Sequence, residues 1–185
     1  LLGIAPGKAA KWAAIDIRER VMAMTELPVE FVKDTAAACV AELVAGRGRS
    51  IRSFLYIFVD TFIGGGLVLD SHLRGGVSGN AGAVGSMPLG LARGDASSRP
   101  AQLLSVASLF NLESLYLAKG LDAAAAVDDR ALKSPWIAQT ETWLRDAAPA
   151  IALTINSAAC LLDLEGVIID GSFDAALRAQ LIAAV

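Results

Sequence analysis

The chain has 185 residues, of which 55% are hydrophobic and 19% are charged, and its formal net charge is −3. This composition supplies a core for one domain and argues against a disordered chain. The acidic balance gives the chain no basic surface for nucleic acid, so DNA binding would need a further domain outside these residues.

The opening of the chain predicts a strand, a helix and a second strand. Residues 1–5 are a short apolar run, closed by the turn residues Pro6 and Gly7. Apolar residues at helical spacing predict one amphipathic helix over residues 12–24, and residues 29–32 predict a brief strand. Because the opening lacks a methionine and resembles an internal strand and turn, we expect the chain to be a fragment of a longer protein.

Asp34 stands between this brief strand and a predicted helix that ends at Gly46. An aspartate at such a junction is most often the N-cap of the helix, and the residues by themselves favour that role. A carboxylate at the tip of a strand, facing a glycine-lined cleft, is also suited to act as a general base. The sequence pattern leaves both roles open.

The centre of the chain is the stretch 53–88, in which two apolar runs flank a triple glycine. Residues 54–59 and 67–69 predict strands, residues 64–66 are all glycine, and a second glycine-rich segment follows at 75–85. Glycine is needed where φ is positive or where a ligand approaches the backbone closely. Strands that alternate with glycines therefore predict the wall of a ligand site.

A loop, a helix and an acidic turn are predicted next. Residues 78–94 are rich in loop formers, residues 90–100 predict a mobile segment, and residues 103–118 predict a helix. Asp128 and Asp129 form an acidic pair for which the sequence offers no third ligand, and such a pair is typical of a solvated turn.

The last part of the chain predicts three helices and one buried strand. Ser134 and Pro135 suit an N-cap and a first helical residue, for a helix that ends near residue 145. Asp146 is then expected to cap a long apolar helix that ends near residue 163. A strand over 166–169 and a closing helix follow, and the side chains expected to face inward from that helix are Ala176, Leu177, Leu181 and Ala184. This order predicts an α/β fold with a partly antiparallel sheet.

Neither a metal centre nor a membrane span is expected. Cys39 and Cys160 lie far apart in apolar helical patterns, and both are predicted to be buried free thiols in a reduced, cytoplasmic compartment. His72 is the only histidine, so a structural zinc site has no ligand set. The longest uncharged helical run, 147–162, is too short for a span and predicts a buried core helix.

Several motifs in order resemble the ROK family, named for repressors, open reading frames and kinases. PVEFVKDTAAACVAE (28–42) is similar to its strand–Asn-Asp-Ala–helix segment, and DTFIGGGLVLD (60–70) to its Gly-Thr-Gly-Ile-Gly-Gly-Gly phosphate loop. GNAGAVGSMP (79–88) is similar to its Gly-Asn-Ala-Gly-Glu-Ile-Gly-His sugar loop. The resemblance covers nearly the whole chain, as the C-terminal lobe of the family. It implies the actin-like, ribonuclease-H-like ATPase fold, an α/β fold whose mixed sheet has flanking helices.

The resemblance also implies where ligands bind. Asp34 matches the catalytic aspartate, which in the kinases takes the proton from the sugar hydroxyl. The positions implied to bind the sugar or effector are Lys33, Asp34, Gly79, Asn80, Ala83 and Ser86. The positions implied to hold nucleotide phosphates are Thr61, Gly64, Gly65 and Gly66. For Lys33 a solvated surface position is an equal alternative, and Asn80 either holds its loop or contacts the ligand.

The chain departs from the family at positions that carry chemistry. The asparagine before the catalytic aspartate is Lys33, and the sugar-gripping glutamate and histidine are Ala83 and Ser86. Each lost charge-assisted hydrogen bond costs about 1.5–3 kcal/mol, so affinity for an unmodified hexose should be weak. Two phosphate-loop glycines are Asp60, whose carboxylate repels phosphate, and Phe62, whose ring blocks close approach.

Cofactor expectations follow from the same comparison of motifs. Zinc-binding members carry a His and Cys cluster after the sugar loop, whereas residues 90–113 of this chain contain no His or Cys, so no zinc is expected. ATP and Mg²⁺ are expected only if the chain is a kinase, and otherwise no cofactor is expected. Asp170, Gly171 and Ser172 replace a glycine-rich turn on the nucleotide side.

Three functions remain from the sequence. The leading one is the effector-binding and dimerisation domain, over residues 1–185, of a sugar-responsive ROK transcriptional regulator. Such a protein would be a homodimer that binds a sugar or sugar derivative, and would contact operator DNA through a winged-helix domain upstream of this chain, where the first phosphate motif also lies. The rival is an ATP-dependent sugar kinase with Asp34 as general base. The third is a degenerate domain that acts only through self-association.

Overall fold

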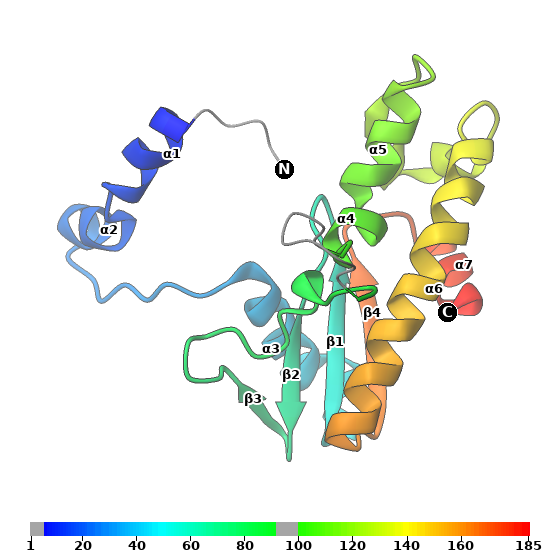
Figure 1. Ribbon diagram of the computed structural model, residues 1–185. Helices are drawn as coiled ribbons and strands as arrows, with labels where there is room; N and C mark the ends of the chain where they lie inside the picture. Colours follow the sequence, from blue (N-terminus) through cyan, green and yellow to red (C-terminus); the bar gives the residue numbers. More distant parts are fainter. Residues whose placement is uncertain (1–5, 92–99) are drawn as a thin grey trace. The chain divides into compact units, whose positions relative to one another are not determined.

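The computed structural model describes residues 6–91 and 100–185, and it divides the chain into two units that meet between Lys33 and Asp34 (Figure 1). The strand predicted over residues 1–5 lies outside the described residues, as does most of the mobile segment predicted over 90–100.

The first unit contains helices α1 (Pro6–Ala13) and α2 (Ile17–Thr25). The single helix predicted over 12–24 is wrong, because Asp16 is extended and caps α2, its Oδ1 accepting the N–H of Glu19 at 3.0 Å. The turn predicted at Pro6 and Gly7 is also wrong, since the fixed φ of proline suits the first helical position. Residues 29–32 are not a strand, because no described strand pairs with them.

The second unit is built on a four-stranded sheet in the order β3-β2-β1-β4. Its strands are β1 (Phe54–Val59), β2 (Gly64–Leu69), β3 (His72–Arg74) and β4 (Gly166–Gly171). β1 pairs antiparallel with β2 and parallel with β4, and β3 pairs antiparallel with β2. The predicted mixed sheet is therefore confirmed. The glycines at 64–66, expected between two strands, lie inside β2.

Helices cover both faces of the sheet (Figure 1). Helix α3 (Asp34–Ala45) lies over one face, and α4 (Leu104–Ala107), α5 (Leu109–Leu117), α6 (Ile137–Leu162) and α7 (Ala175–Ala184) form the other layer. Successive side chains of a strand point to opposite faces, so the central strand β1 feeds both cores. Phe54 and Tyr56 join the core under α3, whereas Leu55, Ile57 and Val59 join the larger core under α5 to α7.

The helical layer differs from the expected boundaries at three places. The helix predicted over 103–118 is two helices, because Ser108 between them is extended. α6 runs unbroken past Asp146 and Pro149, with Ala147 and Ile151 buried on its inner face and Pro149 on its outer face. The same helix begins at Ile137, two residues after Pro135.

Three burial predictions are also wrong. Ala176 and Ala184 are exposed, and α7 instead buries Leu177 and Leu181, the two larger side chains one turn apart. Cys160 is exposed whereas Cys39 is buried. The described part of the chain contains no helix long and apolar enough to cross a membrane.

Candidate functional site

The ends of three strands and the start of α3 lie at one edge of the sheet, and several of the positions predicted to bind ligands lie there. The parallel strands β1 and β4 both end there, with Val59 opposite Gly171, and β2 begins there at Gly64. α3 also begins at this edge, because a Cβ built on Gly64 would lie 2.7 Å from Cγ2 of Thr35. Open α/β sheets bind ligands at the carboxyl ends of their parallel strands, where helix N-termini favour anions.

Asp34 is the first residue of α3 and is exposed. Its Oδ1 accepts the N–H of Thr35 at 2.7 Å, so the carboxylate already serves the first turn of the helix. Its exposure also leaves it open to a ligand at this edge. The N-cap position predicted for Asp34 is off by one residue, because Asp34 is already the first residue of the helix. Its role as a general base remains a prediction. Lys33 directly precedes it in the chain and belongs to the first unit.

The turn between β1 and β2, residues 60–63, is tied to the start of α5. The carbonyl of Asp60 accepts the N–H of Leu109 at 2.9 Å, and the carbonyl of Thr61 accepts the N–H of Phe110 at 3.3 Å. Oδ1 of Asp60 accepts the N–H of Thr61 at 2.6 Å. These bonds fix the turn that the resemblance assigns to nucleotide phosphates.

Two aromatic rings and two carboxylates lie in this turn or on the adjoining first turns of α5. The ring of Phe62 lies 6.2 Å, centroid to centroid, from that of Phe110. Glu113 lies one turn along α5 from Leu109, and burial together with the charge of Asp60 raises the pKa of its carboxyl. Sequence reasoning missed Glu113, although its helical spacing from Leu109 placed it on the same helix face.

The three glycines of β2 make room for protein on both faces of the strand. A Cβ on Gly66 would lie 2.7 Å from the Cβ of Cys39 in α3, while one on Gly65 would lie 2.9 Å from the carbonyl oxygen of Gly82. Gly64 faces α3 as Gly66 does. Close packing thus accounts for these residues, and their role toward phosphate remains a prediction.

The loop over residues 75–86 carries the predicted sugar-side positions and packs on β2. Gly79 and Gly82 have φ of +69° and +75°, conformations that side chains rarely adopt. Asn80 and Ala83 are exposed, as is Ser86, whose backbone N–H donates to the carbonyl of Ala83 at 3.2 Å. The loop ends in a short 3-10 helix, η2 (Val84–Ser86).

This loop meets the β1–β2 turn. A Cβ on Gly85 would clash with the carbonyl oxygen of Ile63, so only glycine allows the two segments to approach. The structure therefore brings Ser86 close in the fold to the phosphate-side turn, at the edge where α3 begins.

Asp170, on the nucleotide side of the same edge, is bonded to two neighbours. It forms an ion pair with Arg178 of α7 and accepts the hydroxyl of Tyr56 at 3.4 Å. Burial and the Asp170 charge raise the pKa of Tyr56. The carboxylate that replaces a glycine-rich turn thus anchors α7 to the sheet. Over residues 6–91 and 100–185, no three His, Cys, Asp or Glu side chains are grouped to hold a metal ion.

Comparison with known proteins places the chain in a family that includes kinases and repressors. The model of the ROK family matches residues 2–179. The chain is 27% identical over 175 residues to the N-acetylmannosamine kinase of Yersinia pestis, covering 93% of this chain and 59% of that protein. It is 29% identical over 80 residues to the xylose repressor of Bacillus subtilis, covering 43% of this chain and 21% of that protein.

The fold has solved counterparts among ROK proteins. The ROK hexokinase from Thermus thermophilus superposes with a TM-score of 0.65 at 25% identity, over 91% of this chain and 58% of that one. The chain therefore spans less than two thirds of each of these relatives. Its mixed sheet with flanking helices is that of the actin-like ATPase fold, and the chain belongs to the ROK family.

Proposed function

We propose that this chain is the effector-binding and dimerisation lobe of a sugar-responsive ROK transcriptional regulator that does not transfer phosphate. One observation carries the proposal: the turn to which the resemblance assigns nucleotide phosphates contains Asp60 and is hydrogen-bonded to the start of α5. Glu113, one helical turn further along α5, is near enough for the Asp60 charge to help raise the pKa of its carboxyl. The family motif that resembles this turn, Gly-Thr-Gly-Ile-Gly-Gly-Gly, has glycine at the positions of Asp60 and Phe62 and contains no charged residue.

The electrostatics of the turn oppose a nucleotide. Two unit charges of the same sign 4 Å apart repel by about 4 kcal/mol at a protein surface, where the effective dielectric constant is about 20. Each negative phosphate oxygen would meet this repulsion from Asp60. The ring of Phe62, held beside Phe110, also occupies the space in which a glycine backbone would approach phosphate.

The sugar side favours an altered ligand. Ser86 offers a hydroxyl that both donates and accepts, in place of an imidazole, and Ala83 offers no hydrogen bond from its side chain. A sugar derivative therefore fits the changed residues better than an unmodified hexose.

A ligand bound at this edge would contact both α3 and the sheet, and could therefore favour one arrangement of the two over another and so regulate DNA binding. A ligand shifts a conformational equilibrium only by its different affinity for the two states, and a DNA-binding domain upstream of this chain would report that shift. The similarity to a xylose repressor supports this direction of the proposal.

The proposal is tested on the full-length protein that contains this chain. We expect thermal stabilisation by a member of a panel of neutral sugars, N-acyl amino sugars and sugar acids, no stabilisation by ATP with Mg²⁺, and DNA binding that this same member changes. The double variant Asp60→Gly/Phe62→Gly serves as a control, because it should gain nucleotide binding. DNA binding that is absent with and without every member of the panel would overturn the proposal.

A sugar kinase is the second candidate, favoured by Asp34. Its carboxylate is exposed at the first turn of α3, at the ligand edge, and the kinase from Yersinia pestis matches 93% of this chain. A coupled assay for sugar-dependent ADP release decides between the two. If the chain is a kinase, Asp34→Asn should lower turnover by about 10²–10⁴-fold, whereas Asp163→Asn, at the far end of α6, should not.

A further inference from the structure

The helical layer of the second unit is not closed everywhere. The run 147–162 of α6, predicted to be a buried core helix, is buried only on its inner face. Beside the first half of this helix, a hollow of about 340 Å³ lies between α4, α5 and α6. Its lining residues are Ser105 and Val106 of α4, Asn111, Ser114 and Leu115 of α5, and Trp143 and Asp146 of α6. The positions predicted to bind sugar or phosphate are not among them, so the hollow is distinct from the candidate functional site.

The amide and indole groups that line the hollow have their hydrogens bonded within the protein. The side-chain NH₂ of Asn111 donates to the carbonyl of Leu104 at 3.4 Å and to Oγ of Ser108 at 3.0 Å. The indole N–H of Trp143 donates to the carbonyl of Ser108 at 3.2 Å. Both hydrogens of the Asn111 amide are therefore in use, and its Oδ1 is the atom left to accept a bond from a ligand.

The two hydroxyls that line the hollow have also used their hydrogens. The hydroxyl of Ser105 donates to the carbonyl of Gln102 at 2.7 Å, and its oxygen accepts the N–H of the same residue at 3.1 Å. The hydroxyl of Ser114 donates to the carbonyl of Phe110 at 2.7 Å. A serine hydroxyl has one hydrogen and two lone pairs, so both oxygens can accept a further bond but cannot donate one.

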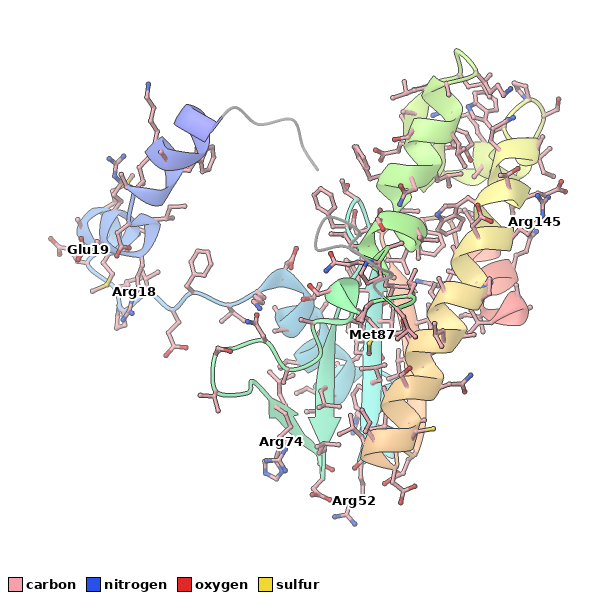
Figure 2. The ribbon with its side chains drawn as sticks, in the orientation of Figure 1. Arg18, Glu19, Arg52, Arg74, Met87 and Arg145 are labelled. Atoms are coloured by element: carbon pink, nitrogen blue, oxygen red, sulfur yellow. The ribbon has the colours of Figure 1, made fainter. Side chains whose placement is uncertain are left out.

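The carboxylate of Asp146 completes this set of acceptors. It has no hydrogen bond or ion pair with any described residue. The adjacent cation, Arg145, borders a neighbouring hollow of about 470 Å³ and not this one, and Figure 2 shows it on the side of α6 away from α5. The described lining therefore carries one negative charge and several acceptors, with no free side-chain donor, beside the apolar groups of Val106, Leu115 and Trp143.

We propose that this hollow binds a small primary amine in its ammonium form, with the ammonium at Asp146 and the hydrocarbon body against Val106 and Leu115. An ammonium has three donors and no acceptor, which complements a lining that offers acceptors alone. Apolar walls with a few polar groups are typical of sites for small organic molecules. A bare Ca²⁺ ion fits less well, because it takes about six to eight oxygen ligands and the apolar walls supply none.

Benzylammonium is a suitable probe, because it joins one ammonium to an apolar ring, and benzyl alcohol is its neutral counterpart. Isothermal titration calorimetry on the full-length protein should show at least tenfold higher affinity for benzylammonium, since charge-assisted hydrogen bonds are about twice as strong as neutral ones. Equal affinity for the two probes overturns the proposal. So does the absence of benzylammonium binding at every soluble concentration.

Two variants test whether binding takes place in the hollow. Asp146→Asn keeps the shape of the side chain and should lower the affinity for benzylammonium at least tenfold, whereas an unchanged affinity overturns the proposal. Asp163→Asn, which removes another exposed carboxylate just after the end of α6, should leave the affinity unchanged. Sugar-dependent stabilisation should persist in both variants, which separates failure of this site from failure of the proposed ligand site.

A tethered ammonium tests the same recognition without any added ligand. Ser114→Lys places a flexible amine on the wall of the hollow, at an exposed helix position that suits lysine. It should block benzylammonium and raise the unfolding midpoint, and the rise should disappear when Asp146→Asn is added. A midpoint shift that is the same with and without Asp146→Asn overturns the proposal, because the amine would then not be recognised by the carboxylate.

Discussion

The side chain of Cys39 in α3 lies directly against Gly66 in β2. A Cβ built on Gly66 would be 2.7 Å from the Cβ of Cys39 and 2.8 Å from its Sγ, closer than real side chains approach. Cys39 itself is fully buried among Phe54, Tyr56 and Val68. This contact sets how closely the helix that begins at Asp34 packs on the sheet, and so it fixes the position of the ligand edge.

Gly66→Ala is expected to destabilise the protein by about 1–3 kcal/mol, the usual effect of overpacking a closed core. Urea unfolding followed by circular dichroism measures the change. Gly75→Ala is the matched control, because a Cβ there meets nothing within 4 Å. Equal midpoints for the two variants would mean that α3 moves freely on the sheet.

The thiol of Cys39 should be inert in the folded protein. Burial, with the nearby charge of Glu42, raises its pKa to about 11. At pH 8 only about one molecule in a thousand would carry the reactive thiolate. In a Cys160→Ser variant, whose only thiol is Cys39, we expect no reaction with Ellman's reagent until denaturant is added. Rapid reaction of the native variant would contradict the packing of α3 against β2.

Thr140 of α6 links that helix to α5 and to a 3-10 helix, η4 (Asp129–Leu132), through one buried hydroxyl. Its Oγ1 lies 2.6 Å from the hydroxyl of Tyr116 and donates to the carbonyl of Ala131, also at 2.6 Å. Thr140→Val should lower the free energy of unfolding by about 1–3 kcal/mol, because it leaves buried polar groups without partners. Thr142→Val, which removes only a bond to the carbonyl of Ala138, should cost far less. Adding Tyr116→Phe to Thr140→Val should recover part of the loss.

The strands with the clearest sequence patterns were predictable, and the one whose pattern is broken was not. β1 is a run of branched and aromatic residues buried on both faces, and its predicted bounds match. β2 begins with three glycines, which by themselves disfavour a strand. The three glycines nevertheless form a strand, because β1 pairs with them and because α3 packs where their side chains would be. Both reasons are tertiary contacts, which no local sequence pattern reveals.

The helix boundary predicted between residue 145 and Asp146 failed for a similar reason. Proline normally interrupts a helix, yet α6 continues because Ala147 and Ile151 pack inward on both sides of Pro149. In the candidate site, Asp34, Asp60 and Phe62 could be placed by motif. Glu113 could not, since it is distant in the sequence and only the bonds between α5 and the β1–β2 turn bring it there.

Glu113 should make the stability of the protein fall as the pH rises. Burial and the charge of Asp60 raise the pKa of its carboxyl above the ordinary value of 4.5, so the folded state binds its proton more tightly than the unfolded state does. The contribution to stability is therefore full below pH 4.5 and is lost as the pH rises through the higher folded pKa. Glu113→Gln removes this loss, and we expect it to stabilise the protein at pH 7 by about 0.5 kcal/mol.

The difference in stability between the Glu113→Gln variant and the original protein isolates the contribution of the Glu113 carboxyl from those of all other titrating groups. Unfolding midpoints compared at pH 4 and pH 7 should show the variant gaining stability relative to the original only at the higher pH. Asp60→Asn should reduce that gain, because it removes one of the two causes of the shifted pKa. Glu141→Gln, at an exposed position on α6, provides the control for the loss of one carboxylate from the helical layer. A gain from Glu113→Gln that is the same at both pH values would place its carboxyl in open solvent, away from Asp60, and would remove the acidic pair on which the argument against nucleotide binding rests.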